Sequence, residues 1–504
     1  MRRRRHPGHA RRGGPHPRPR GGGGQGPRER AARHPPRRDA HDRHDRRGRR
    51  VPRLPHRAAH RAARDDARRG APPRRRGPVS PRQHGPQGRS RRALPRARRR
   101  GGRHLPPRGA RRGVRRPRRH PHSQGGSVTA APALDASALA ALAGRSLLLT
   151  TDWNDAELEA LLATAARLAA LDRAGRMPAL LPNEVAYALF FDHSTRTKSA
   201  WAGAAARLGM QPVIVDGATT QVEHGESAAE TGAMLGMNVH ALGIRHDRIL
   251  GEGQTFLREV RRGVDQYLAA AGERRAVPVV NLQCDVDHPT QTLADLMWLR
   301  ERLPGGLRGR RIAVSWAYSP SYAKPLSVPQ GLITLLTRHG AEVTLAHPDG
   351  YRLMDACMER AAAQAAASGG AFRVTDSMDE AFEGADAVYP KSWGPYDLML
   401  ERVAANRARD AAALAAIERR ALERNAAHRD WICDERRMAL TRNGGALYLH
   451  CLPADIGDEV SPGVMARHAL DVARQAQGKV YVIAALLAVA KVPDLARRLE
   501  EAGR

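Results

Sequence analysis

Residues 185–208 read VAYALFFDHSTRTKSAWAGAAARL, and this stretch decides the fold class. Its first seven residues form an apolar run that is typical of a buried strand, and its alanine-rich end is typical of a helix. Between them lies the polar turn 192–197. A strand, a turn and a helix form the repeating unit of α/β proteins with parallel sheets. The stretch therefore predicts an α/β fold.

The same alternation continues along the chain from residue 128. We expect strands at 185–191, 213–215, 241–244, 278–282, 312–316, 343–346, 387–389 and 446–451. We expect helices at 155–171, 198–208, 227–237, 292–302, 327–338, 351–367 and 404–424, the first of them capped by Thr151, Asp152 or Asn154. The stretch 303–311 is rich in Pro and Gly and suits a join between domains. These patterns predict two doubly wound parallel-sheet domains, 128–302 and 310–475, and a last helix, 478–502, that packs back on the first domain.

Charge is distributed very unevenly along the 504 residues, whose formal net charge is +34. Such a charge suggests a nucleic-acid or membrane partner. However, residues 1–127 contain 43 Arg, no Lys and 6 Asp or Glu, whereas the remaining 377 residues have a net charge of −3. The overall charge therefore does not indicate the function of the larger part of the chain.

Residues 1–127 also lack Ile, Phe, Tyr, Trp, Cys, Asn, Thr and Lys. With so little apolar surface to bury, this segment is predicted to be disordered. An arginine-rich tail could bind RNA or DNA phosphates, but this one has no aromatic residue to stack on bases. It also lacks the apolar core of a signal peptide and the serine content of a transit peptide. The interpretation we favour is GC-rich DNA translated in an unselected frame, with the native protein starting at Val128.

Cysteine usage and hydropathy indicate where the larger part of the chain works. Its four cysteines form no CxxC pair, which suits a reducing cytoplasm. The longest apolar run, 480–490, has only 11 residues between two lysines, too few to span a bilayer. We therefore expect a cytoplasmic protein with no membrane partner.

Polar residues follow several of the expected strands, where an open parallel sheet binds its ligands. Ser194, Thr195, Arg196 and Thr197 open a helix directly after the first strand. Free N–H groups and the helix dipole make such a position an anion site, to which hydroxyls and a guanidinium add donors. The alternative is an ordinary Ser or Thr helix cap beside a surface arginine. Taken alone, the motif favours that alternative.

Three further strand ends carry chemistry-bearing residues. Arg245 follows one strand, and its default interpretation is a surface residue. The stretch 284–288 contains Cys, two Asp and His, but no second cluster has matching spacing, so we expect hydrogen bonding there and no metal site. His450 and Cys451 are adjacent on a strand and would point to opposite faces, which argues against a nucleophile pair. Pro453 is a candidate for a cis peptide in a functional turn.

Together these motifs resemble the aspartate/ornithine carbamoyltransferase superfamily. The matching motifs are, in order, Ser194-Thr195-Arg196-Thr197, Arg245, His288-Pro289-Thr290-Gln291 and His450-Cys451-Leu452-Pro453. The resemblance covers essentially all of 128–504. The stretches 191–201, 319–330 and 391–393 are similar to the knotted branch of the superfamily, and within it to the YgeW type. The resemblance implies a knotted fold, a homotrimer whose sites are completed by a neighbouring chain through 221–226, and no metal or organic cofactor.

The resemblance also implies roles for single residues in binding carbamoyl phosphate. Ser194, Thr195, Arg196 and Thr197 would bind its phosphate. Arg245 and His288 would polarise the carbonyl oxygen and act as the catalytic residues. Gln291 would contact the carbamoyl amide, and backbone carbonyls near Cys451 and Leu452 would orient the NH₂ group. An amine would attack the carbonyl carbon and phosphate would leave; the reverse phosphorolysis is equally compatible with the sequence.

The sequence departs from ornithine enzymes where the second substrate would bind. Their Asp and Ser-Met-Gly segment is replaced by Lys391-Ser392-Trp393-Gly394, and their C-terminal arginine by Lys479. Lys324, Lys391 and Lys479 suggest an acidic group on an amino-acid-like acceptor, with Ser392 and Trp393 nearby; the alternative is that each lysine is a solvated surface residue. Three other functions stay open: an ornithine carbamoyltransferase making citrulline, a nucleic-acid-binding protein that uses its tail, and a pseudoenzyme that binds carbamoyl phosphate without turnover.

Overall fold

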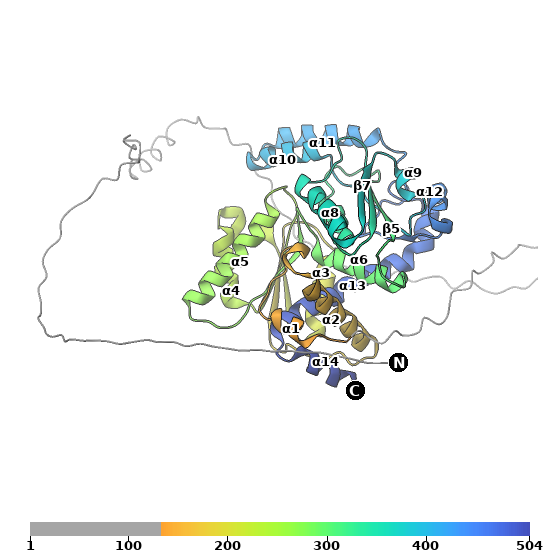
Figure 1. Ribbon diagram of the computed structural model, residues 1–504. Coiled ribbons are helices and arrows are strands. Elements are labelled where there is room, and N and C mark those ends of the chain that lie inside the picture. The colour runs from red at the N-terminus through yellow and green to blue at the C-terminus, as the bar shows by residue number, and fades with distance from the viewer. Residues whose placement is uncertain (1–132) are drawn as a thin grey trace, which may run out of the picture. The chain divides into compact units, whose positions relative to one another are not determined.

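The computed structural model of the chain describes residues 133–504. The predicted disordered segment 1–127, its nucleic-acid binding and the start at Val128 lie outside the described residues. Within the described part, nine strands form two parallel sheets, with strand orders β2-β1-β3-β4 and β7-β6-β5-β8-β9 (Figure 1). The prediction of an α/β fold with two parallel-sheet domains is confirmed.

The first sheet contains β1 Val185–Phe190, β2 Gln211–Asp216, β3 Ala241–His246 and β4 Val279–Cys284. All pairs are parallel, so the carboxyl ends of the four strands lie at one edge. The first core cluster covers one face and contains residues of α2 Asp155–Arg173, α3 Arg196–Arg207 and α6 Pro289–Arg302. The other face packs against α4 Ala228–Asn238 and α5 Gly253–Ala270. The capping residue of α2 is Asn154, one of the three candidates.

Helix α5 was not among the predicted helices, although its sequence carries a clear signal. Leu257, Val260, Val264 and Leu268 are fully or almost fully buried and recur every three or four residues. That spacing places them on one face of a helix, and they pack against β3 and β4. The 3.6-residue period of these apolar positions was therefore sufficient to predict α5.

The second sheet contains β5 Arg311–Ser315, β6 Glu342–Ala346, β7 Ala371–Thr375, β8 Ala387–Pro390 and β9 Leu447–Tyr448. The edge strand β7 was not predicted, because three of its five residues are exposed and it lacks an apolar run. The last strand is shorter than the predicted 446–451. The helices of this half are α7 Ser327–Arg338, α8 Asp355–Ser368, α9 Met378–Phe382, α10 Tyr396–Arg407, α11 Ala411–Ala426 and α12 Glu435–Leu440.

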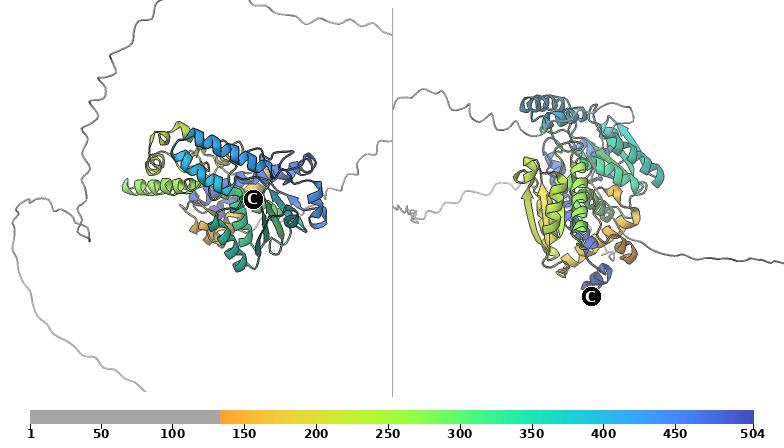
Figure 2. Two further views of the ribbon diagram at one scale, coloured as in Figure 1. Left: turned by 90° about the horizontal axis from the view of Figure 1, so that it is seen from above. Right: turned by 90° about the vertical axis from the view of Figure 1, so that its left-hand side faces the viewer.

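The single helix predicted at 404–424 is wrong. The chain instead forms α10 and α11, which lie side by side (Figure 2). They are separated at Arg409, whose φ of 52° cannot continue a right-handed helix. The Asp410 side chain then accepts a hydrogen bond from Ala413 N at 2.9 Å and caps α11.

The C-terminal helix also differs from the predicted 478–502. Helix α13 extends from Pro462 to Lys491, and a short α14 Leu495–Gly503 follows after a break at Pro493 and Asp494. Proline cannot continue the hydrogen-bond ladder, and Asp494 has a φ of 51°. The cap Ser461 of α13 donates to Glu435 of the second domain, whereas Lys491 at its end donates to Ala276 O and pairs with Glu184 of the first. Helix α13 therefore spans both domains.

Packing around α13 joins the two domains into one core. Helix α13 contacts α2, α3 and α6, and its buried residues belong to the same cluster as those of the second sheet. The apolar run 480–490 lies within this cluster. Of the helices between residues 133 and 504, none is both long and apolar enough to cross a membrane. The remaining elements are short: α1 Ala136–Ala141 and the 3₁₀ turns Thr150–Asp152, Gly217–Thr219, Gln221–His224 and Arg442–Gly444.

Candidate active site

The polar turn after β1 forms the N-terminus of α3. Ser194 Oγ accepts a hydrogen bond from Thr197 N at 3.2 Å, so the serine does cap this helix. Within residues 133–504, however, the Arg196 guanidinium makes no hydrogen bond or ion pair with another residue. Burial lowers the pKa of Arg196, and the neighbouring charge of Arg245 adds to this. The turn thus combines a helix N-terminus with a partly buried cation that is free to bind an anion.

Arg245 lies at the end of β3, at a point where the register between β3 and β4 shifts. Such a bulge redirects a side chain at a strand end. The guanidinium makes two hydrogen bonds to Asp247, from Nε at 3.0 Å and from Nη2 at 2.9 Å. Burial raises the pKa of the fully enclosed Asp247 carboxyl, and the bidentate contact with Arg245 acts in the opposite direction. Arg245 is therefore a fixed cation at the edge of the first sheet, and not a loose surface residue.

The acidic turn between β4 and α6 is structural. Asp285 accepts hydrogen bonds from Gly251 N and Gln254 N, both at 2.7 Å, and so anchors the start of α5. Asp287 accepts from the N–H and hydroxyl of Thr150 at 2.8 and 2.9 Å. Burial raises the pKa of Asp287 to about 6. Between residues 133 and 504 no group of three or more His, Cys, Asp or Glu side chains is placed to hold a metal ion.

His288 and Lys479 are brought together from distant parts of the sequence. The Nε2 atom of His288 lies 3.5 Å from Lys479 Nζ, and that Nζ lies 3.3 Å from Thr197 Oγ1. Burial, followed by the charges of Lys479 and Arg245, holds the pKa of His288 well below its ordinary value, so the imidazole is neutral. Burial also lowers the pKa of Lys479 to about 7. The structure thus places Lys479 beside the predicted phosphate and carbonyl residues, because α13 crosses the first domain there.

A buried hydrogen-bond network that the sequence analysis missed lies next to His288. Asp295 accepts from Gln291 Nε2 at 2.7 Å, from Gln475 Nε2 at 2.6 Å and from the Tyr389 hydroxyl at 3.2 Å. The Oε1 atom of Gln475 accepts in turn from His450 N at 3.2 Å. The spacing of Gln291 and Asp295 on one helix was a signal, because residues four apart share a face. The positions of Gln475 and Tyr389 in the sequence gave no such signal.

The loop after β9 has unusual backbone geometry. Leu452 has a φ of 54°, and the Leu452–Pro453 peptide is cis, as predicted. Leu452 N donates to His450 Nδ1 at 2.8 Å, which fixes the imidazole against the loop. Burial raises the pKa of the Cys451 thiol. Both facts argue against a thiolate–imidazole nucleophile pair at this loop.

Lys324 does not provide a free positive charge. Its Nζ lies 2.8 Å from Asp455 Oδ2 and 2.9 Å from Glu459 Oε2. Glu459 is itself buried, and its Oε1 accepts from Ser392 N at 2.7 Å. Burial alone would raise the pKa of Glu459, but His450 and Lys324 hold it well below its ordinary value. Two carboxylates therefore already neutralise Lys324, which leaves it little charge to offer an acidic group of a substrate.

Residues 391–393 combine a polar pair with a core residue. Lys391 Nζ donates to Pro325 O at 3.1 Å and to Ser392 O at 2.7 Å, while the Ser392 hydroxyl is buried without a partner in the described chain. Trp393 is fully buried, and its indole N–H donates to Tyr351 O at 2.7 Å. The Trp393 side chain is therefore part of the core. Lys391 and Ser392 have polar groups that a ligand could use.

Two models of one protein family match the chain. The carbamoyl-phosphate-binding domain of aspartate/ornithine carbamoyltransferase matches residues 145–301, and the aspartate/ornithine-binding domain matches residues 326–490. The chain belongs to the aspartate/ornithine carbamoyltransferase family. It is thus an enzyme that transfers a carbamoyl group to an amino group. The first match contains all four strands of the first sheet, and the second contains β6, β7, β8 and β9 of the second sheet.

Relatives in the carbamoyltransferase family align with this chain over nearly their whole length. YgeW of Escherichia coli (strain K12), a carbamoyltransferase-family protein, is 44% identical over 365 residues, which cover 71% of this chain and 92% of YgeW. N-acetylornithine carbamoyltransferase of Xanthomonas campestris pv. campestris is 30% identical, with 68% of this chain and 97% of the relative covered. A crystal structure of an N-acetyl-L-ornithine transcarbamylase variant, complexed with carbamyl phosphate and N-succinyl-L-norvaline, superimposes with a TM-score of 0.56 at 28% identity and covers 68% and 98% of the two chains.

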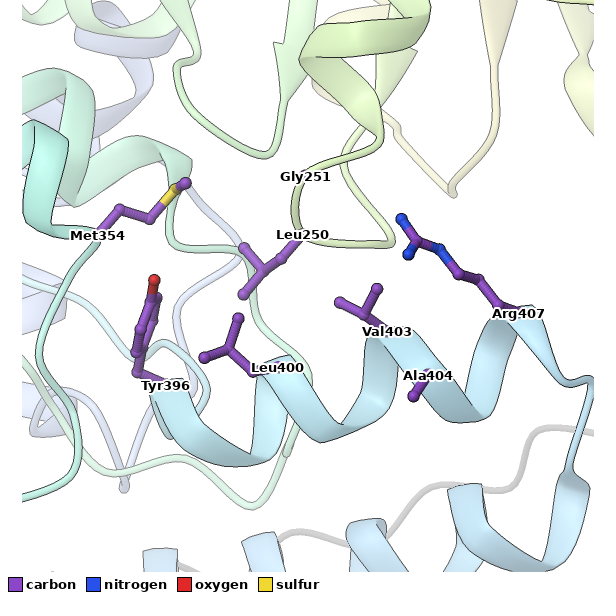
Figure 3. Close-up of a pocket in the computed structure, with 8 residues that line it drawn as sticks. All are labelled: Leu250, Gly251, Met354, Tyr396, Leu400, Val403, Ala404 and Arg407. Carbon is purple, nitrogen blue, oxygen red and sulfur yellow. The ribbon is translucent and has the colours of Figure 1, made fainter. Parts of the chain in front are cut away.

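This carbamoyltransferase also has a pocket away from the predicted site residues. It has a volume of about 310 Å³ and lies between α10 and the loop after β3, lined mostly by apolar side chains (Figure 3). Leu250 and Gly251 come from the loop, and Leu400, Val403 and Arg407 come from α10. Beside it, Arg407 pairs with Glu252 at 2.8 Å. Here the second domain touches the loop that follows β3.

Proposed function

We propose that this carbamoyltransferase moves the carbamoyl group of carbamoyl phosphate to the amino group of an amino-acid-like acceptor and releases phosphate, or catalyses the reverse phosphorolysis. In this proposal residues 128–302 bind carbamoyl phosphate and residues 310–475 bind the second substrate. The observation that supports it best is the gathering of Arg196, Arg245 and Lys479 around the N-terminus of α3 and the neutral His288. Three cationic side chains at a helix N-terminus suit a dianionic phosphate.

The phosphate would bind at the turn that starts α3. Ser194, Thr195, Arg196 and Thr197 offer hydroxyls, backbone N–H groups and a guanidinium. Arg196 has no competing partner in the described chain, so its charge is available to a ligand. The Thr197 hydroxyl already lies 3.3 Å from Lys479, which would bring a second positive charge to the same phosphate.

The carbamoyl group would lie between the first sheet and the loop after β9. Arg245 and His288 would hold the carbonyl oxygen, and Gln291 with the carbonyls of Cys451 and Leu452 would accept from the NH₂ group. When the amine attacks the carbonyl carbon, the oxygen gains negative charge in a tetrahedral intermediate. Donors that are already fixed there contribute about 10²–10³-fold each. The bond between the carbonyl carbon and the bridging phosphate oxygen then breaks, phosphate leaves with that oxygen, and the amine nitrogen gives up a proton to the departing phosphate. This scheme needs no metal.

The second substrate would lie near Lys391, Ser392 and Lys324. Lys391 uses two of its three N–H donors on backbone carbonyls, so one is left for a carboxylate of the acceptor. The buried Ser392 hydroxyl supports a polar ligand at this place. The related structure with N-succinyl-L-norvaline shows that a family member accommodates an acylated amino acid. An acceptor that carries a carboxylate fits these observations better than a simple diamine.

We further propose a homotrimer in the cytoplasm, with a knotted chain and active sites shared between subunits. The segment 221–226, predicted to reach a neighbouring site, lines a pocket of about 480 Å³ together with Glu230 and the exposed Met234. Sedimentation analysis tests the trimer.

The test of the proposed function measures phosphate release by the full chain with carbamoyl phosphate and a panel of amines. The panel contains ornithine, its N-acetyl and N-succinyl derivatives, aspartate, putrescine, diaminopropionate and oxamate. We expect one acceptor to give strong turnover. Thermal stabilisation by carbamoyl phosphate alone would support the donor site and reject the panel's acceptors. Neither turnover nor stabilisation would contradict the proposal and favour a pseudoenzyme.

A further inference from the structure

Asp295 is the centre of the buried network beside the proposed carbamoyl site. Its carboxylate is fully buried and accepts hydrogen bonds from three different elements: Gln291 of α6, Gln475 of α13 and Tyr389 of β8. An ionised carboxylate only accepts hydrogen bonds. Every group that faces Asp295 must therefore present a donor to it.

This requirement fixes the orientation of the Gln291 amide. Its NH₂ group donates to Asp295 Oδ1 at 2.7 Å, so its carbonyl oxygen must point the other way. That Oε1 atom is buried and has no hydrogen-bond partner among residues 133–504. His288, Gln291 and Asp295 are spaced three and four residues apart and share one face of the chain at the start of α6. A free buried acceptor thus lies one helical turn from the imidazole.

The same requirement fixes Gln475 and, through it, the loop after β9. The NH₂ group of Gln475 donates to Asp295 at 2.6 Å, which turns its Oε1 toward His450 N at 3.2 Å. His450 is the residue before Cys451 and Leu452, whose carbonyls are the other acceptors of the proposed site. Asp295 therefore orients an amide oxygen on α6 and, through Gln475, holds the backbone of the loop at His450.

We propose that Asp295 is a positioning residue that sets donor specificity, because it fixes Gln291 and the loop 450–452 as hydrogen-bond acceptors for an NH₂ group. This inference rests on the proposed function. A site with fixed acceptors favours a phosphate anhydride whose acyl group carries N–H, as in carbamoyl phosphate. It disfavours acetyl phosphate, whose methyl group would leave those buried acceptors unpaired.

The experiment compares the dissociation constants of carbamoyl phosphate and acetyl phosphate for the full chain by calorimetry. For the wild type we expect carbamoyl phosphate to bind about 10- to 100-fold more tightly, the effect of one or two buried acceptors. Asp295→Leu removes the acceptor that orients both glutamines. We expect the preference to fall to a few-fold while inorganic phosphate still binds with wild-type affinity. Asp295→Asn keeps an oxygen toward the glutamines and should retain most of the preference.

Two further variants separate positioning from loss of stability. Gln475→Met removes the link between Asp295 and His450 but leaves the Gln291–Asp295 hydrogen bond, so the preference should fall partway even if Asp295→Leu does not fold. Asp386→Leu is the matched control, since Asp386 is a buried carboxylate that pairs with Arg310 and Arg442 in the second domain. It should lower the melting temperature without changing the preference.

An unchanged preference in Asp295→Leu, or in Gln475→Met where the first variant does not fold, would overturn the inference. A wild type without preference would also overturn it, since there would be no specificity for Asp295 to set. In that case turnover in the amine panel would leave the proposed function standing, so the two failures are distinguishable.

Discussion

The two edges of the site balance their charges differently. At the edge of the first sheet, Arg196 has no protein partner within the described chain and Lys479 contacts the uncharged groups of Thr197 and His288. At the edge of the second sheet, Lys324 lies between Asp455 and Glu459. Arg196 and Lys479 of the first edge thus have no carboxylate partner in the described chain. At the second edge Lys324 is neutralised, whereas Lys391 donates only to backbone carbonyls. In the proposed function the first edge, the donor edge, suits a phosphate, and the second, the acceptor edge, has one cation left for a carboxylate.

The largest effect is expected from removing the unpartnered cation. Arg196→Ala should weaken carbamoyl phosphate binding by about 10³-fold, because a charge-assisted contact to phosphate disappears. Arg207→Ala, at the opposite end of the same helix and paired with Asp172, is the matched control. Calorimetry measures both. Normal binding by Arg196→Ala would remove the contrast between the two edges.

His288→Ala tests the neutral group of the donor edge. We expect kcat to fall by about 10²–10³-fold with a much smaller change in KM for carbamoyl phosphate, because the imidazole acts on the developing oxyanion. Steady-state kinetics with the best acceptor measure both constants. An unchanged kcat would exclude His288 from the mechanism.

Glu459→Gln tests the charge balance around Lys324 at the edge of the second sheet. The change leaves Lys324 with one carboxylate, so KM for the acceptor should rise by about 10-fold while carbamoyl phosphate binding stays unchanged.

Because the folded pKa of Glu459 is depressed, its contribution to stability is present above its ordinary pKa and is lost as the pH falls through the folded value. Acid unfolding of the variant should therefore begin from a lower stability at neutral pH and depend less on pH. Equal loss of donor and acceptor binding would contradict the separation of the edges.

Lys479 should make the affinity for carbamoyl phosphate, and not that for the acceptor, depend on pH. Since its pKa is lowered to about 7, it is increasingly neutral above that pH and offers less charge to phosphate. Affinity for carbamoyl phosphate should fall by up to about tenfold per pH unit above 7. Lys479→Arg, charged at every accessible pH, should abolish this slope. A slope that persists in this variant would assign it to another group.

The smallest effect is expected at the contact between α10 and the loop after β3, beside the apolar pocket, which we call the rim. Arg407 is mostly exposed in its pair with Glu252, so Arg407→Ala should change the free energy of unfolding by less than about 1 kcal/mol. Urea unfolding measures it. A larger loss would show that the rim, and not the shared core around α13, holds the domains together.

The donor edge could be predicted from the sequence because its signals are local. The turn 194–197 joins a strand to a helix, Arg245 lies at the end of a strand and His288 in the turn after the next strand, so the parallel topology brings them to one edge. The fold class followed from the same repetition of strand and helix. The partners of these residues could not be predicted, because they come from far away in the sequence. Lys324 meets Asp455 across 131 positions, and Gln475 meets Asp295 across 180.

Failures in the element assignments have equally specific causes. The edge strand β7 carries exposed residues and no apolar run, so hydropathy did not mark it. The break at Arg409 depends on a left-handed backbone conformation that its residue type does not announce. The placement of Lys479 at the donor edge depends on the length of α13, which extends 17 residues upstream of Lys479.

Helix α13 has a consequence for how such enzymes can diversify. It starts on the second domain, ends on the first, and carries Gln475 and Lys479 between the two. A recombination event at the 303–311 join would exchange acceptor recognition and part of the donor machinery together. The incoming helix would also have to match the apolar surface of α2, α3 and α6. An exchange of halves would therefore have to preserve both the contacts of Gln475 and Lys479 and this apolar packing at once.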